Sequence, residues 1–190
     1  MVIQDGRVTR GEASKKAIQR AAVSIVAAQG LSDLTHRAVA AAAGVSHALV
    51  TYHFATAAAL RRATFGHSID RLTDELEALL EDLHDPSDVP RMGSDLAVLM
   101  VTDLRAETLA TYELMLAASR DPELRPLALA LTDRIADLLE AVAGDRDRAK
   151  AASIALLGNV LASLATGADD DLPALRAGVG HLIENFDPRR

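Results

Sequence analysis

Side chains that can contact double-stranded DNA are concentrated between residues 35 and 53. His47 can hydrogen-bond to a base edge, and Ala48 and Leu49 can touch a thymine methyl group. Arg37 can reach a guanine or a phosphate, and nearby hydroxyl and imidazole groups suit phosphate contact. Together with two lysines earlier in the chain, the predicted DNA-contacting set is Thr35, Arg37, Ser46, His47, Ala48, Leu49, Thr51, Tyr52, His53, Lys15 and Lys16. We expect His36 and Arg61-Arg62 to lie on solvated surface.

Capping and turn residues around this set predict two short helices. Thr35 is suited to cap a helix that runs to about Ala43, and Ser46 to cap another that ends near Phe54. Gly44 lies between them, where a turn with positive φ is easily accommodated. Two helices at a steep angle around such a turn can place the second helix in a major groove. The segment therefore predicts a helix-turn-helix.

The rest of the chain is predicted to be helical as well. Hydrophobic residues make up 49% of the 190 residues, mostly as Ala and Leu, and there are only six prolines. Both residue types favour helix, so we predict an all-α fold. Local signals predict a first helix that starts at Thr9 and ends before Gly30, and a long helix capped by Thr56. They also predict helices over 89–104, 107–119, 146–166 and 172–186, and a further helix that starts at Asp121-Pro122.

Charge is distributed unevenly along the chain. The net charge is −7, but residues 1–67 hold eight Lys or Arg and three acids, giving +5. Residues 68–190 carry the balance of −12. A basic N-terminal part joined to an acidic body is typical of a small nucleic-acid-binding module on a larger domain, although chance clustering on solvated faces gives the same pattern.

Several classes of site and location are not expected. The chain has no cysteine, so it has no disulfide and no thiolate metal site. No histidine pair has metal-ligand spacing, and no nucleophile and base are brought together by a motif, so we predict neither a metal nor a catalytic site. We find no signal peptide and no apolar run near the roughly 18 residues that span a bilayer, and we expect a cytoplasmic protein without membrane partners.

The motif resembles the tetracycline-repressor (TetR) family of bacterial transcriptional regulators. The resemblance covers about residues 9–65 and rests on Thr35-His36-Arg37, Val39-Ala40, Ala43-Gly44-Val45-Ser46, Tyr52-His53-Phe54 and Leu60. It implies about nine helices, with an N-terminal three-helix DNA-binding domain (residues 1–55) and a C-terminal ligand-binding and dimerisation domain (residues 56–190). The junction falls near the start of the long helix.

Three positions depart from the family pattern. Ala48 stands where Gly or Pro is frequent, and Thr51 where Tyr is frequent. Ala57 replaces a Lys that usually begins the long helix, which removes one ionic phosphate contact. We therefore expect affinity to depend more on Arg37, Tyr52 and the N-terminal basic residues.

The resemblance implies a homodimer that binds a palindromic operator and is released by an unidentified small molecule. We expect this effector to be mainly apolar, and we expect no other cofactor. The candidate ligand-binding residues are Leu96, Leu99, Met100, Thr108, Tyr112, Met115 and Leu116, although an apolar stripe of this kind is also typical of plain core. The candidate dimer residues, on two helices rich in small side chains, are Ile154, Leu157, Gly158, Leu161, Leu175, Val179, Leu182 and Ile183.

Two other hypotheses remain open at this point. The chain can be a helical dimer that binds a ligand or a protein but no longer binds DNA, because Ala57 removes a phosphate contact. It can also be an all-α enzyme, although the sequence shows no convergent catalytic group. The dependence of DNA binding on salt separates the first alternative from a repressor.

Overall fold

The computed structural model describes residues 6–184, which form nine α-helices joined by short turns and 3-10 segments, with no strand in that range. The all-α prediction is confirmed. The helices are α1 (Gly6–Gln29), α2 (His36–Ala43), α3 (His47–His53), α4 (Ala57–Glu81), α5 (Val89–Val101), α6 (Arg105–Ala118), α7 (Arg125–Ala143), α8 (Arg146–Thr166) and α9 (Leu172–Glu184).

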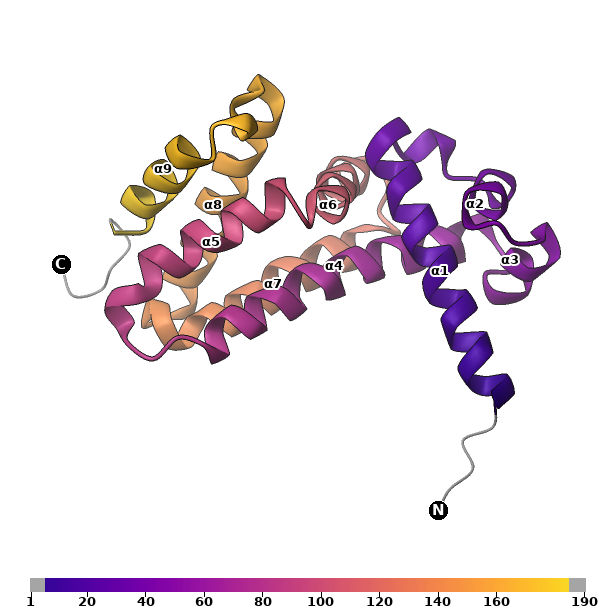
Figure 1. The fold of residues 1–190 in the computed structure, drawn as a ribbon, viewed down its shortest axis with the longest axis horizontal. Helices are drawn as coiled ribbons and strands as arrows, with labels where there is room; N and C mark the ends of the chain where they lie inside the picture. Colours follow the sequence, from indigo (N-terminus) through magenta and orange to yellow (C-terminus); the bar gives the residue numbers. More distant parts are fainter. Residues whose placement is uncertain (1–5, 185–190) are drawn as a thin grey trace, which may run out of the picture.

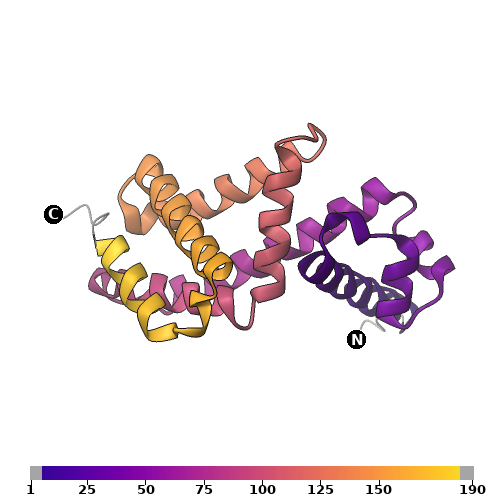
Figure 2. The ribbon, with the colours of Figure 1, turned by 90° about the horizontal axis from the view of Figure 1, so that it is seen from above.

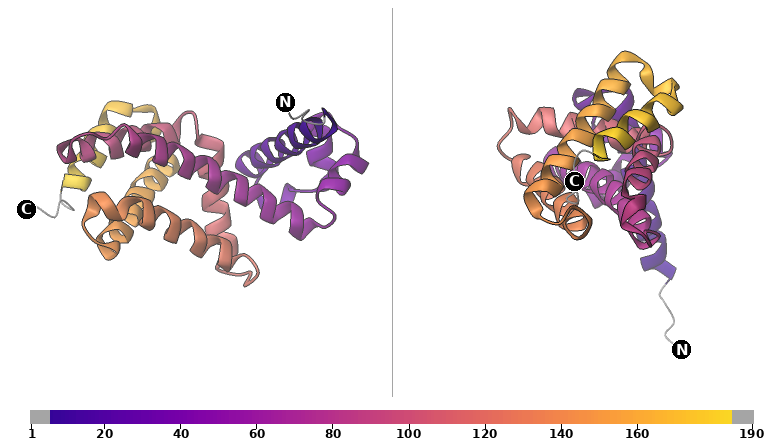
Figure 3. Two further views of the ribbon diagram at one scale, coloured as in Figure 1. Left: turned by 90° about the horizontal axis from the view of Figure 1, so that it is seen from below. Right: turned by 90° about the vertical axis from the view of Figure 1, so that its left-hand side faces the viewer.

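The first three helices form one end of the molecule. Figure 1 shows α1, α2 and α3 grouped together, with the long helix α4 running from them into a body made of α5 to α9. Seen from above, α8 and α9 lie at the end opposite to α2 and α3 (Figure 2). Figure 3 shows α4 continuing from the α2–α3 end along the body. A displacement of α4 within the body would therefore change the position of α3.

Side-chain caps fix the boundaries of α2, α3 and α4, as predicted. The Thr35 hydroxyl oxygen accepts a hydrogen bond from the Ala38 amide at 3.1 Å. The Ser46 oxygen accepts from the Leu49 amide at 3.2 Å, and the Thr56 oxygen from the Ala59 amide at 3.0 Å. Gly44 has φ +66°, the left-handed conformation that the turn between α2 and α3 requires.

Two predicted helix starts are wrong. Thr9 lies inside α1, because the helix already begins at Gly6. Asp121 does not cap α7. Its carboxylate accepts from the Glu123 amide at 3.0 Å in a separate turn, and α7 begins only at Arg125, with a proline in its first positions. Pro126, and not Pro122, therefore lies in the first turn of the helix.

Two apolar clusters hold the helices together. The first joins α1 to α4 with α6 and α7, and includes Ile18, Phe54, Phe65 and Leu114, each almost fully buried. The second lies between α4 and the helices of the body. The helix-turn-helix therefore packs on a core to which α6 and α7 also contribute. The domain division between residues 55 and 56 stays a prediction.

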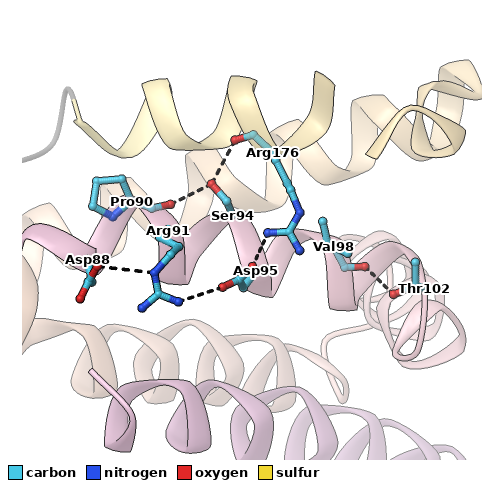
Figure 4. Close-up of polar contacts among 8 residues, drawn as sticks. All are labelled: Asp88, Pro90, Arg91, Ser94, Asp95, Val98, Thr102 and Arg176. Carbon is cyan, nitrogen blue, oxygen red and sulfur yellow. Dashed lines mark hydrogen bonds and ion pairs between the residues drawn. The ribbon is translucent and has the colours of Figure 1, made fainter. Parts of the chain in front are cut away.

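Helix α9 is fastened to α5 by close packing and by polar contacts. A Cβ on Gly93 of α5 would overlap the Cδ1 atom of Ile183 of α9, so the glycine permits the close approach. The Ser94 hydroxyl lies 2.8 Å from the Pro90 carbonyl and 3.0 Å from the Arg176 carbonyl, and Arg176 forms an ion pair with Asp95 (Figure 4). One side of α9 thus packs against α5 within the same subunit.

Helix α8 differs from the expectation that no apolar run comes near the length that spans a bilayer. Among the described helices it is the one that is long and apolar enough, by length and composition, to cross a membrane, with 21 residues and a mean hydropathy of 1.4 in its most apolar window. Part of this apolar surface packs inside the subunit, where Ala149, Leu156 and Val160 are buried. Its other side is exposed and is considered below as an interface.

Candidate nucleic-acid interface

Helix α3 has one buried face and one exposed face. Val50 is fully buried, and Phe54 at its end is 4% exposed; both belong to the first apolar cluster. On the other face Tyr52 is 81% exposed, and His47, Ala48 and Thr51 are exposed as well. The structure thus brings four of the predicted DNA contacts together on the outer surface of one short, rigidly anchored helix.

Basic side chains are present on the two helices that precede α3. Arg37 of α2 and Lys16 of α1 are exposed, and Lys15 is half-buried. The first turns of α2, α3 and α4 contain no acidic side chain. Free backbone N–H groups and the positive ends of the helix dipoles favour anions at such termini. These helix ends and basic side chains can therefore hold phosphates.

Four members of the predicted set have additional or different roles. Leu49 is half-buried and packs against the first apolar cluster, so only part of its side chain is left for the predicted contact with a thymine methyl group. Thr35 and Ser46 use their hydroxyl oxygens as caps, which leaves the hydroxyl hydrogens able to donate to a phosphate. His53 is half-buried, and its ring makes an edge-to-face contact with that of Tyr52, with 5.2 Å between the ring centroids.

His36 was expected on solvated surface, and this expectation is wrong. It is half-buried, and its Nε2 lies 2.6 Å from the carbonyl oxygen of Phe54 at the end of α3. Its ring also lies 6.1 Å from that of His47. Nothing in the spacing of α2 signals this contact, because it joins residues that the turn brings together in space.

Arg61 and Arg62 lie in the first turns of α4. Arg62 is exposed and forms a long ion pair of 3.8 Å with Glu123. Arg61 is half-buried, and its Nε has no hydrogen-bond partner among the described residues. Only Arg62 matches the expected solvated surface.

A small cavity lies between the helices of the body, and its lining overlaps the predicted ligand-binding residues only in part. Leu96 and Met100 line it, as predicted, together with unpredicted residues of α4, α6, α7 and α8. Leu99, Thr108 and Tyr112 are not among its lining residues. Met115 and Leu116 are exposed on the outside of α6, so their assignment to a pocket is wrong. Amphipathic spacing on α6 did not reveal which of its faces turns inward.

Tyr112 has a structural role instead. Its hydroxyl donates a hydrogen bond to the carbonyl oxygen of Leu157 at 2.6 Å and so ties α6 to α8. Burial raises the pKa of Tyr112 far above its usual value. The phenol therefore stays protonated and remains a donor at every physiological pH.

The predicted dimer residues divide into three groups. Ile154, Gly158 and Leu161 form an exposed stripe on α8, with Ile154 62% and Leu161 46% exposed. Leu182 and Ile183 are half-buried on α9. The three remaining residues, Leu157, Leu175 and Val179, are buried in the second apolar cluster of the subunit, so their assignment to an interface is wrong.

Comparison with known proteins agrees with this architecture. Residues 18–64 match the model of the bacterial regulatory proteins of the tetR family, and residues 84–185 match the tetracyclin repressor-like C-terminal domain. No curated protein matches the chain. Because the second match alone covers more than half of the sequence, the chain belongs to the TetR family of DNA-binding transcriptional regulators.

Solved structures show the same likeness. A TetR family member from Streptomyces coelicolor shares 31% identity over 89% of this chain and 97% of its own, with a TM-score of 0.75. The multidrug binding protein EbrR, complexed with ethidium, shares 30% identity over 89% of this chain and 98% of its own, with a TM-score of 0.64. A transcriptional regulator from a Rhodococcus species, at 20% identity over 90% and 95% of the two chains, shows the same fold with a TM-score of 0.79.

Proposed function

We propose that this protein is a ligand-responsive transcriptional repressor of the cytoplasm that binds a palindromic operator as a homodimer. The observation that carries the proposal is the exposed face of α3, with His47, Thr51 and Tyr52 presented above a fully buried Val50. A short helix held in this way can enter a major groove while the flanking helix ends hold phosphates.

The exposed stripe of α8 supports the dimer. Ile154, Gly158 and Leu161 lie three to four residues apart and face away from the subunit. Ile154 and Leu161 are large apolar side chains that stay exposed two turns apart on α8, which favours an interaction surface there. Two copies joined through α8 and α9 would present two α3 helices to successive major grooves, roughly 34–36 Å apart.

Helix α4 supports the response to a ligand. Leu72 and Leu76 of α4 form part of the cavity wall, and the same helix begins directly after α3. Arg134 of α7 holds this segment of α4 through contacts of 2.9 Å to Asp70 and 3.3 Å to Glu77. A ligand that binds one position of α4 better than another shifts the protein between the two. The likeness to EbrR, solved with ethidium, also favours an effector site in the body.

The first experiment is selection of random duplex DNA by the purified protein, followed by binding measurements at several salt concentrations. We expect an enriched palindrome and an affinity that falls steeply with salt, because each phosphate contact contributes about −0.9 to the log–log slope. Arg37→Ala and Tyr52→Ala should each weaken binding about tenfold or more. Arg120→Ala, an exposed arginine of the body, is the matched control.

A folded dimer that enriches no sequence, with or without added ligand, would contradict the proposal that the protein is a repressor. The alternative, a ligand-binding dimer without DNA function, predicts weak binding that none of these substitutions changes. It draws its support from Ala57, which is exposed at the start of α4 and offers no charge to a phosphate.

A further inference from the structure

The cavity between the helices of the body has a distinctive lining. Leucine and isoleucine side chains of α4, α5, α7 and α8 form most of its wall, with Met100 at one side. The lining includes no charged and no aromatic side chain. Its two polar members are Thr111 of α6 and Ser153 of α8. A charged ligand would find no counter-ion here, and burial of an unpaired charge is strongly unfavourable.

The two hydroxyl groups of the lining differ in one respect. The Ser153 hydroxyl donates to the Lys150 carbonyl at 2.8 Å, one turn back in its own helix. The Thr111 side chain is 1% exposed, and its Oγ1 has no hydrogen-bond partner among the described residues. Buried hydroxyl groups are nearly always paired, and an unpaired one destabilises the protein. Thr111 thus lines the cavity and carries a hydroxyl that has no partner among the described residues, so a bound molecule that reaches this oxygen can pair with it.

The size of the cavity restricts that molecule. Its volume is about 30 Å³, which is space for a very few atoms before the walls move. Drug-sized ligands occupy pockets of roughly 300–1,000 Å³. Met100 has three rotatable bonds and can change shape to enlarge the space. A slender, flexible molecule requires the smallest rearrangement.

We propose that this cavity binds a small, neutral, mainly aliphatic molecule with a single hydroxyl or carbonyl group that hydrogen-bonds to Thr111. This inference rests on the proposed ligand response and specifies its chemistry. A hydroxyl or carbonyl satisfies Thr111 Oγ1, and an alkyl chain contacts the leucines of α4, α5 and α7. The aromatic cation ethidium, with which EbrR was solved, needs a larger rearrangement than a slender alcohol does, and its charge has no counter-ion in the lining.

The test uses the intact protein without DNA and three probes. 1-Hexanol is the neutral probe, hexylammonium is its charged analogue of similar length, and ethidium is the aromatic cation. Calorimetric titration and the midpoint of thermal unfolding report binding directly, since a ligand of the native state raises that midpoint. We expect binding by 1-hexanol and none in the cavity by the two cations.

Two variants test the role of the hydroxyl. Thr111→Val keeps the shape of the side chain and removes the unpaired group, so it should weaken 1-hexanol binding about five- to tenfold. The same variant without ligand should unfold at a higher temperature than the wild type. Ser153→Ala removes a hydroxyl that is already paired, and it should bind 1-hexanol like the wild type.

Three results would overturn the proposal: no binding of 1-hexanol, equal binding of hexylammonium, or unchanged affinity in Thr111→Val. Operator binding is measured separately on the same preparation. If the alcohol binds but leaves operator affinity unchanged, the ligand class stands and the proposed response fails. If the operator is bound but no alcohol is, the repressor stands and the ligand class is wrong.

Discussion

The imidazole Nε2 of His36 lies 2.6 Å from the carbonyl oxygen of Phe54, and so joins the start of α2 to the end of α3. A carbonyl oxygen can only accept, so Nε2 carries the proton and donates. The contact closes the helix-turn-helix on the side opposite to Gly44. It therefore holds α3 at a fixed angle to α2, although His36 need not touch DNA.

His36→Ala should lower affinity for the operator about fivefold, because one hydrogen bond of about 1 kcal/mol that positions α3 is lost. Affinity for random DNA and the salt slope should stay unchanged, since no phosphate contact is removed. His36→Gln can place an amide N–H near the position of Nε2 and should restore part of the affinity. Equal operator affinity in His36→Ala and the wild type would show that the angle of α3 does not depend on this contact.

Ala57→Lys should increase DNA affinity. Ala57 is the first residue of α4 and is exposed, and resemblance to the family places a lysine there. One added phosphate contact should steepen the dependence of log affinity on log salt by about 0.9. Ala78→Lys adds the same charge at an exposed position near the far end of α4, and it should leave the slope unchanged. An identical slope in Ala57→Lys would mean that the start of α4 does not reach the DNA backbone.

Local signals in the sequence predicted most helix boundaries and the face of α3. Caps at Thr35, Ser46 and Thr56 act within four residues, so the sequence contains all the information that they need. Only two of the candidate ligand-binding residues, Leu96 and Met100, line the cavity, because its lining depends on how α6 is rotated against α5, α7 and α8. Spacing shows that Thr111 and Met115 are one turn apart, but only packing places the first in the cavity and the second outside.

Interface residues show the same limit. Ile154 and Leu157 are both apolar residues of α8, and the sequence does not indicate which side of the helix faces the subunit. In the structure Ile154 points outward and Leu157 is buried in the core. Contacts between distant segments, such as His36 with Phe54, are invisible to periodicity for the same reason.

His67 should make stability depend on pH. Burial lowers the pKa of His67 below its usual value of 6.5, with Arg20 of α1 and Arg71 lowering it further, while Glu107 of α6 and Asp70 oppose them. The native state therefore resists protonation of His67 more than the unfolded chain does. Its favourable contribution is complete above pH 6.5 and is lost as the pH falls from 6.5 through the lower native pKa.

Urea unfolding at pH 8 and at pH 5.5, at one protein concentration, measures this effect. His67→Gln should lose less stability between the two pH values than the wild type, because its side chain does not titrate. His84→Gln, at an exposed position in the turn after α4, should lose as much as the wild type. If His67→Gln and the wild type lose the same stability, His67 does not contribute to the pH dependence.

The double substitution Ile154→Glu and Leu161→Glu should separate the proposed dimer. Both side chains are exposed in the subunit, so charge is tolerated in the monomer but is repelled across a two-fold interface. Sedimentation equilibrium should report a monomer. Affinity for a palindromic operator should fall roughly a hundredfold or more, because the two α3 helices no longer bind as one unit. Leu129→Glu, a residue 62% exposed on α7, is the control and should leave both the dimer and the operator affinity intact. If the double variant remains a dimer while Leu129→Glu dissociates, the interface lies on α7 rather than on α8.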